Sequence, residues 1–372
     1  MKNKIIKIFT IALFIFFIGS NVNATLLGDF DNDEEITSFD AYKTLELSNE
    51  DREFAKEELG TLDIDKDGTI SSFDAYLILS YSIGIDENGY WNIVEPDPEE
   101  EIFNSYYNPV ESKYYYEQLT DDEKKIYDAL NNNKDELKEA KRYDLEDMPI
   151  TTEAQTDELY WNAYYAYKYD NPDTFYMQTY SYSWRECGDD EVQMSSISPY
   201  LYKNILDIDV SITELEKARR EAIVSLTATN DFEKVFQLHN YLVKNNTYDY
   251  RVINSPGFED VGTYTAYGAL VRGKSVCEGY AMAYKYLLNA VGIECEIITG
   301  VANGGGHAWN AVKLDGNWYY VDTTWDDPID DPEYVGFNYF LIGSEKLEKD
   351  HVITLPTDRF IYPIISKLDY TK

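Results

Sequence analysis

Cys277 is the residue of this sequence whose type and position are best suited to chemistry. It lies in "GKSVCEGYAMAYKYLL", residues 273–288, where a polar turn leads into an apolar stretch that predicts a helix ending at Gly292. In the first turn of a helix, free backbone N–H groups and the helix dipole favour a thiolate. A cysteine in an apolar helix is more often part of the core, so Cys277 alone leaves both interpretations open.

An imidazole and a carboxylate follow on a predicted β-hairpin. The stretch "HAWNAVKLDGNWYYVD", residues 307–322, contains Asp315-Gly316, a two-residue turn signal. In that register Trp309 faces Asp322, so that His307 and Asp322 lie on one face as diagonal neighbours, roughly 7 to 8 Å apart at the backbone. A thiol, an imidazole and a carboxylate in these contexts match the nucleophile, base and orienter of a cysteine acyl-transfer enzyme.

The other cysteines provide a comparison for Cys277. The sequence has three cysteines, which cannot all pair with one another, so at least one thiol is free. Cys295 alternates with Ile293 and Ile297 in a predicted strand, which indicates buried packing. Whether Cys187 pairs with Cys295 is left open.

Three segments resemble the core of the bacterial transglutaminase-like superfamily. They are "LVRGKSVCEGYAMAYKYLL", "HAWNAVKLDGNWYYVDTTWDDP" and "NYFLIGSEKLEKDH", and the resemblance runs from about Asp231 to His351. It implies a papain-like α+β fold in which Cys277 is the nucleophile, His307 the base and Asp322 the orienter.

Other residues of this region receive secondary roles. The backbone N–H of Cys277 is the first candidate for an oxyanion donor, and Tyr267 is the second. His239 and His351 match positions of the superfamily outside the triad, and both are expected to be structural.

The resemblance implies acyl-enzyme chemistry without a catalytic cofactor, and it leaves the acyl acceptor open. The superfamily includes transglutaminases, proteases, amidases and inactive relatives. We expect a cysteine peptidase or amidase, because bulk water competes at an open cleft. A protein-crosslinking transglutaminase and a non-catalytic peptide-binding or cell-wall-binding module on the same fold are the alternatives.

A second chemical signal is a duplicated acidic loop. "DFDNDEEITSFD" at 29–40 matches "DIDKDGTISSFD" at 63–74, and each has oxygen ligands at positions 1, 3, 5, 7, 9 and 12 of a calcium loop, with a backbone carbonyl at position 7. Position 6, which favours glycine, is Gly68 in the second loop but Glu34 in the first, so the first site is expected to bind more weakly. The predicted metal ligands are Asp29, Asp31, Asp33, Glu35, Thr37 and Asp40, and then Asp63, Asp65, Asp67, Thr69, Ser71 and Asp74.

The duplicated loops, from about Gly28 to Ile85, resemble a type I dockerin. The resemblance implies a small all-α module with a helix after each loop, two structural Ca²⁺ ions, and the cohesin domain of a cellulosome scaffoldin as partner. In that family loop positions 10 and 11 contact cohesin, and here they are Ser38 with Phe39 and Ser72 with Phe73.

The first residues predict export. Three lysines precede an apolar run at 8–18, and a small-residue cleavage pattern ends at Ala24. The alternative is a membrane anchor, but the run is shorter than the roughly 18 residues that a spanning helix needs. We therefore expect a secreted, extracellular protein on a cellulosome-type scaffold.

The charge of the chain limits its partners, and its motifs divide it into regions. Lys and Arg number 32 against 69 Asp and Glu, and a formal charge of −37 disfavours nucleic acid and anionic membrane surfaces as partners. The two family resemblances imply a cohesin and a protein or peptide substrate as partners. The predicted regions are a signal peptide at 1–24, a dockerin at 26–88, an extended acidic linker at 94–104, a helical accessory region at 105–230 and the catalytic domain at 231–372.

Overall fold

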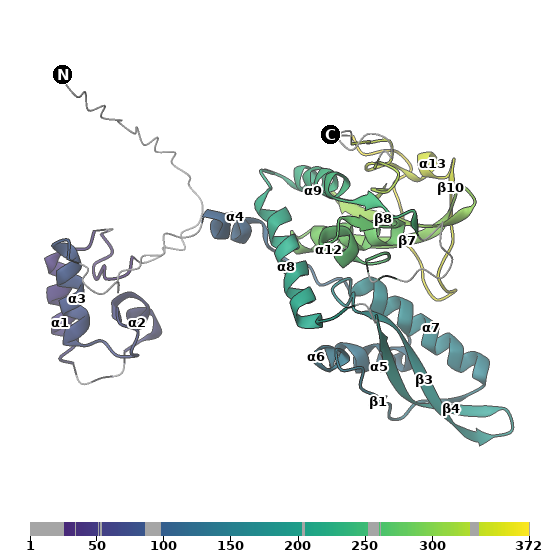
Figure 1. The fold of residues 1–372 in the computed structure, drawn as a ribbon, viewed down its shortest axis with the longest axis horizontal. Coiled ribbons are helices and arrows are strands. Elements are labelled where there is room, and N and C mark those ends of the chain that lie inside the picture. Colours follow the sequence, from purple (N-terminus) through teal and green to yellow (C-terminus); the bar gives the residue numbers. More distant parts are fainter. Residues whose placement is uncertain are drawn as a thin grey trace. The chain divides into compact units, whose positions relative to one another are not determined.

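The computed structural model describes two compact units, residues 1–97 and 98–372 (Figure 1). The described residues are 26–33, 35–50, 52, 54–85, 98–202, 205–251, 260, 262–327 and 335–371. The predicted signal peptide at 1–24 lies outside them. Within these ranges no helix has the length and apolar character needed to cross a bilayer.

The first unit consists of three short helices. They are α1 (Ser38–Leu47), α2 (Lys56–Leu62) and α3 (Ser72–Ser82). A helix follows each acidic loop, as the sequence predicts, because Thr37 and Ser71 form capping boxes with Asp40 and Asp74. A small core around the fully buried Ile78 joins the helices.

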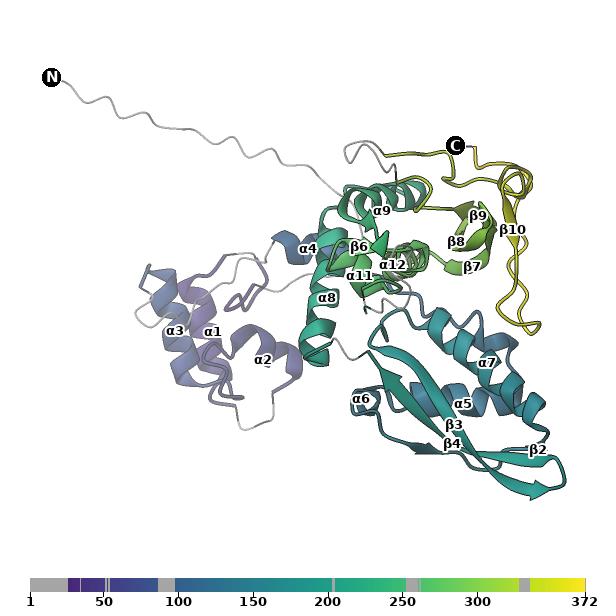
Figure 2. The same cartoon turned by 45° about the vertical axis from the view of Figure 1, so that its right-hand side comes forward.

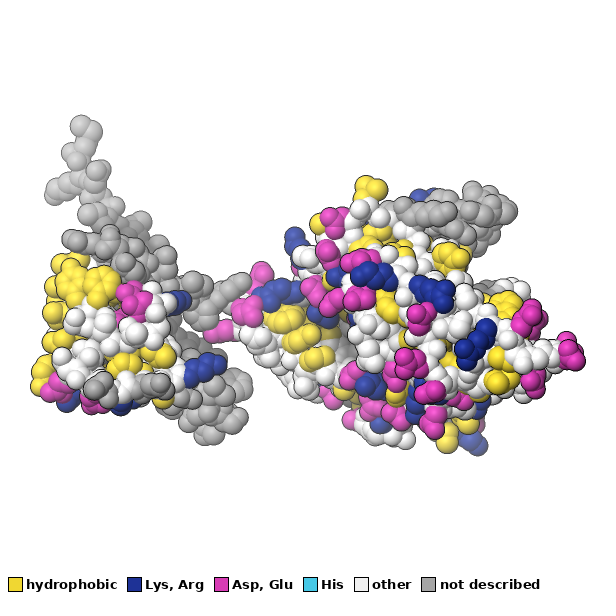
Figure 3. Space-filling view, turned by 90° about the horizontal axis from the view of Figure 1, so that it is seen from below, with side chains coloured by type: hydrophobic (Ala, Val, Ile, Leu, Met, Phe, Trp, Pro, Cys, Tyr) yellow, Lys and Arg dark blue, Asp and Glu magenta, His cyan; other side chains and the backbone are white. Residues whose placement is uncertain are grey.

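Apolar side chains also remain on the surface of this unit, where Figure 3 shows them gathered together. They repeat at the same spacing in the two copies and include both phenylalanines that follow the predicted ligand loops. The exposed residues are Phe39, Tyr42 and Leu45 on α1 and Phe73, Tyr76 and Leu79 on α3.

The second unit begins with a mixed region. Its elements are α4 (Pro98–Tyr106), η1 (Tyr116–Gln118), α5 (Asp121–Asn131), α6 (Lys134–Leu137), β1 (Tyr143–Asp144), β2 (Ile150–Thr151), α7 (Glu153–Asp170), β3 (Met177–Gly188), β4 (Glu191–Leu201) and α8 (Ile208–Val224). The strands form one sheet in which β3 pairs with β4 as a long antiparallel hairpin.

Two expectations for this region need correction. The predicted extended linker is helical from Pro98 onward, because proline is tolerated in a first turn, three glutamates favour the helix N-terminus, and Arg220 of α8 pairs with Glu100 at 2.6 Å. The accessory region is also not only helical, since β1 to β4 lie within it. The predicted boundary at 230/231 stays a prediction.

The remaining elements surround the predicted catalytic residues. They are α9 (Asp231–Asn245), β5 (Thr247–Tyr248), α11 (Ala266–Leu270), β6 (Lys274–Ser275), α12 (Cys277–Ala290), β7 (Cys295–Ala302), β8 (Gly305–Leu314), β9 (Asn317–Val321), α13 (Ser344–Leu347) and β10 (His351–Ile353). The main sheet has the order β10-β7-β8-β9 with antiparallel neighbours, and α12 packs against it (Figure 2). The molecule is therefore of the predicted α+β class.

The predicted hairpin register is confirmed. Leu314 pairs with Asn317, and the ladder continues to Asn310 opposite Val321. Asp315 and Gly316 have φ values of 50° and 79°, as a primed two-residue turn requires. The turn therefore determines which side chains of β8 and β9 share a face.

One large core joins the two parts of the second unit. Tyr115 from the accessory region and Leu287 from α12 belong to the same cluster of buried residues. A buried ion pair between Lys285 and Glu296 also reaches Ser112, whose hydroxyl donates to Glu296 at 2.8 Å. The accessory region thus supports the helix that carries Cys277.

Candidate functional site

Cys277 is the first residue of α12 and is partly exposed. Val276 precedes it in an extended conformation, so the chain turns into the helix at the cysteine itself. The first amide groups of a helix have no acceptor within the helix and lie at the positive end of its dipole. The local sequence therefore puts the thiol sulfur beside an anion-stabilising end of the helix.

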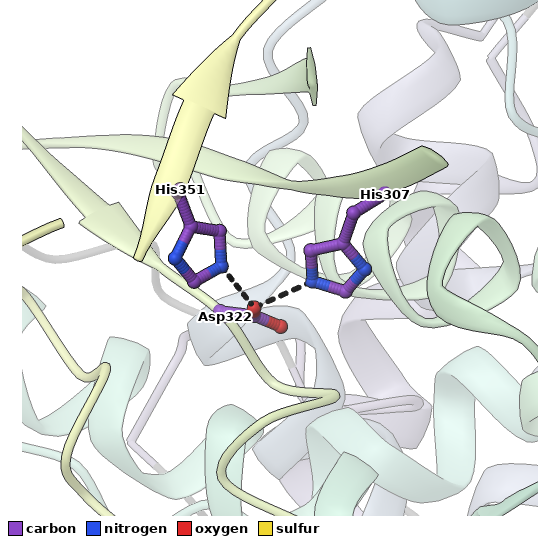
Figure 4. A group of neighbouring side chains, drawn as sticks. All are labelled: His307, Asp322 and His351. Carbon is purple, nitrogen blue, oxygen red and sulfur yellow. Dashed lines mark hydrogen bonds and ion pairs between the residues drawn. The ribbon is translucent and has the colours of Figure 1, made fainter. Parts of the chain in front are cut away.

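His307 lies on β8 between Cys277 and Asp322. Its Nε2 is 2.7 Å from Asp322 Oδ2 (Figure 4). Its ring also forms a hydrogen bond with the Cys277 thiol. Burial disfavours the imidazolium, but hydrogen bonds to Asp322 and Cys277, together with their charges, outweigh burial and raise the pKa of His307 to about 10. The contacts therefore favour the protonated imidazole of His307 at neutral pH, beside the Cys277 thiol.

Asp322 follows β9 and is fully buried. Its Oδ1 accepts hydrogen bonds from the backbone N–H groups of Thr324 and Trp325 at 3.0 and 3.1 Å, while Oδ2 faces His307. Burial would raise the pKa of this carboxyl, but the hydrogen bonds it accepts from His307 and His351 outweigh burial and lower its pKa. The orienter therefore stays ionised although it is buried.

An open cleft of about 780 Å³ lies beside Cys277 and His307. Cys277 and His307 line it, and Asp322 lies behind His307. Tyrosines and a tryptophan supply much of the remaining wall, which the sequence analysis did not identify because no spacing signal connects these residues. They are Tyr248, Tyr250, Tyr264 and Trp325.

Tyr267 is not among the residues that line the cleft. Its hydroxyl donates to Glu214 at 2.6 Å, and its ring stacks on Phe175 with centroids 4.7 Å apart. The second candidate from the sequence is therefore wrong. The backbone N–H of Cys277 remains the candidate, because it belongs to the first turn of α12.

The two further histidines of this region are buried and paired. His239 Nε2 is 3.2 Å from Asp326 Oδ2, which fits a structural role. His351 Nε2 is 3.2 Å from Asp322 Oδ2, so this histidine contacts the predicted triad itself. The sequence analysis missed that contact because β10 lies far along the chain from β9.

All three cysteines are free thiols. Cys295 is fully buried, and burial holds the pKa of its thiol well above the ordinary value. Cys187 is exposed near the end of β3. Of the three, only Cys277 lies beside a histidine and a cleft.

The acidic loops bring three of the predicted carboxylate ligands together in each copy. Carboxylate oxygens of Asp29, Asp31 and Asp40 all lie within 4.8 Å of one another, and Asp63, Asp65 and Asp74 do the same in the second loop. All of these groups are oxygen donors, which suits a hard cation such as Ca²⁺. The residues present therefore fit the ion.

The backbone of the two loops is also alike. Asn32 and Lys66, both at loop position 4, have φ values of 57° and 56°, and Gly68 has a φ of 91°. Partial desolvation and then repulsion from neighbouring carboxylates raise the pKa of Asp31, which a bound cation would relieve. Glu34 lies outside the described residues.

Two family models match the chain. Residues 220–323 match the transglutaminase-like superfamily, and residues 27–81 match the type I dockerin domain. Curated relatives include the kyphoscoliosis peptidases of Mus musculus and Homo sapiens, which are 26% and 27% identical over 166 residues. The match covers 39% of this chain and 25% of each relative, so the chain spans about a quarter of their length.

Solved structures show weaker likeness. A TGase crystal structure is 18% identical with a TM-score of 0.28, covering 39% of this chain and 44% of the other. A Cytophaga hutchinsonii protein provisionally assigned as a cysteine protease is 17% identical with a TM-score of 0.25, covering 40% and 65%. The family assignment rests on the two family models. The chain contains a domain of the transglutaminase-like superfamily, preceded along the sequence by a type I dockerin domain.

Proposed function

We propose that this protein is a secreted cysteine peptidase or amidase that docks on a cohesin through its dockerin domain. The observation that supports the enzyme is the position of His307 between the Cys277 thiol and the buried Asp322 carboxylate at the wall of an open cleft. A cysteine paired with an oriented histidine is an activated nucleophile.

In the proposed mechanism, the Cys277 thiolate attacks the carbonyl carbon of a peptide or amide and forms a C–S bond. The carbonyl oxygen becomes an oxyanion that the first-turn amides of α12 stabilise. When the C–N bond breaks, His307 gives its proton to the leaving amine and an acyl-thioester remains. Asp322 stabilises the imidazolium before that transfer.

Water completes the proposed reaction. It attacks the thioester while His307 takes its proton, so that a carboxylic acid leaves and the thiolate is regenerated. The cleft is not enclosed, which would give water access to the thioester. The peptidase names of the two curated relatives also favour hydrolysis over crosslinking.

The dockerin domain supports attachment to a scaffold. Its predicted ligands would hold two Ca²⁺ ions that fix the loops before α1 and α3, and the ions would neutralise the dense carboxylates. The exposed apolar faces of these helices, which include Phe39 and Phe73, would bind the cohesin. This attachment, with the predicted signal peptide at 1–24, supports an extracellular location.

The decisive experiment incubates a peptide mixture and a labelled primary amine with the protein and uses mass spectrometry to score cleavage and amine incorporation. We expect cleavage by the wild type, none by Cys277→Ala, and normal cleavage by Cys187→Ala, which removes an exposed cysteine elsewhere. Amine incorporation without cleavage would replace hydrolysis by crosslinking. If the wild type gives neither cleavage nor amine incorporation, the proposal of an acyl-transfer enzyme acting on peptides is contradicted.

A further inference from the structure

His351 is a buried histidine that the proposed mechanism does not use. It begins β10, where it pairs with Ala302 of β7, and its side chain has no exposed surface. Aromatic rings pack around it, with Trp325 and Trp309 at centroid distances of 4.4 and 5.1 Å. The ring therefore has little freedom to turn.

Both ring nitrogens of His351 face carboxylates. Nε2 is 3.2 Å from Asp322 Oδ2, and Nδ1 is 2.6 Å from Asp350 Oδ1. Figure 4 shows that His351 and His307 approach Asp322 from opposite sides. An ionised carboxylate oxygen can only accept hydrogen bonds, so His307 and His351 both donate from Nε2 to the same oxygen.

Asp350 holds the far side of His351 in turn. Its Oδ2 accepts a hydrogen bond from the Tyr339 hydroxyl at 2.6 Å, and the side chain is 39% exposed. These side chains form a chain of contacts in the order His307, Asp322, His351, Asp350 and Tyr339. It leads from the cleft to the surface and passes through two buried groups.

We infer that His351 is a positioning residue for the acyl-transfer reaction, and that its Nε2–H holds the Asp322 carboxylate in the orientation in which it accepts from His307. The inference rests on the proposed role of Cys277, His307 and Asp322. A buried carboxylate that loses a donor either turns towards another partner or takes up a proton. Either change weakens its hold on His307.

The pH dependence follows from the groups that face these histidines, which are Cys277, Asp322, Asp350 and Tyr339. The hydrogen bond from His351 lowers the pKa of Asp322 and thus opposes burial. Its removal raises that pKa, so that Asp322 is protonated at a higher pH. Activation of Cys277 should then require a higher pH.

The test measures alkylation of Cys277 by iodoacetamide against pH, with the labelled peptide identified by mass spectrometry so that Cys187 is scored separately. Two variants of His351 separate its contacts. In His351→Gln the side-chain amide nitrogen can replace Nε2 and donate to Asp322. The shorter side chain of His351→Asn can replace only Nδ1, so it keeps the hydrogen bond to Asp350 and loses the one to Asp322. We expect His351→Asn to slow alkylation of Cys277 about tenfold at acidic pH and to move the rise of the alkylation rate to higher pH. We expect the alkylation rate of His351→Gln to stay within about threefold of the wild type.

His239→Asn is the matched control. His239 is equally buried and bonded to Asp326, but no contact with the triad is found for it among the described residues. We expect it to lower the urea midpoint of unfolding and to leave the alkylation profile unchanged. If His351→Gln behaves like His351→Asn, or if His239→Asn shifts the profile equally, the role assigned to His351 is overturned.

The same experiment distinguishes the two proposals. If wild-type Cys277 is alkylated with the pH profile of the exposed Cys187, the proposed enzyme fails whatever the variants do. If wild-type Cys277 reacts at low pH and His351→Asn does so equally, only the inference about His351 fails.

Discussion

At the residue scale, His307 determines the charge state of the site. Burial opposes its positive charge, but its contacts with Asp322 and Cys277 raise its pKa from 6.5 to about 10. A group whose pKa is raised by folding stabilises the folded state when it is protonated. That contribution is complete below pH about 6.5 and is lost as the pH rises through about 10.

We therefore predict that replacement of His307 changes the pH dependence of stability. The free energy of unfolding of the second unit should fall between pH 7 and 10 more steeply in the wild type than in His307→Ala, as measured by urea unfolding at several pH values. Parallel curves for the two proteins would show that the His307 charge does not contribute to folding.

At the scale of elements, close packing of the first turn of α12, at Gly279, fixes the start of the helix at the site. A Cβ built at Gly279 would lie 2.5 Å from the Ser275 Cβ and 3.1 Å from the Thr265 carbonyl oxygen. Glycine is normally unfavourable inside a helix by about 1 kcal/mol relative to alanine. Here the close approach outweighs that preference, since it lets β6 and the start of α12 lie together.

We predict that Gly279→Ala destabilises the second unit by roughly 1–3 kcal/mol, the usual cost of overpacking, and slows alkylation of Cys277. Gly60 in α2 is the matched control, because a Cβ there would meet nothing within 4 Å, and Gly60→Ala should stabilise the first unit by about 0.5–1 kcal/mol. Thermal unfolding measures both. Stabilisation by Gly279→Ala would contradict the packing argument.

The strands and helices differ in how well the sequence predicts them. The β8–β9 register could be worked out because Asp315-Gly316 forms a turn of defined length, and each residue then has a fixed face. The β3–β4 hairpin was missed, although Val192 and Met194 alternate with less buried neighbours in β4, because tyrosine and serine weaken the two-residue contrast. The start of α4 was missed because its contact with Arg220 is tertiary.

At the scale of the whole molecule, the chain consists of two compact units that differ in their predicted need for metal. The first has a small core and two clusters of three carboxylates, whereas the second has a large core. A domain with a core this small is marginally stable, so the binding free energy of a metal ion would add to its stability.

We predict that chelation of calcium affects the first unit alone. In scanning calorimetry EDTA should lower or abolish one transition and leave the other in place, and Asp29→Ala with Asp63→Ala should have the same effect without EDTA. Binding to an immobilised cohesin should be lost in parallel. Binding that persists in excess EDTA would contradict a calcium-dependent dockerin, and a shift of both transitions would contradict independent units.

The sequence by itself determined the residue types, the duplicated loops and the hairpin register, because these depend on spacing over short stretches of chain. It was therefore sufficient to predict that His307 and Asp322 are neighbours. Only the tertiary structure decided that Cys277 meets His307 across α12 and β8, that Tyr267 bonds to Glu214, and that His351 contacts Asp322. Those contacts join elements far apart in the chain, and packing of the whole core determines them.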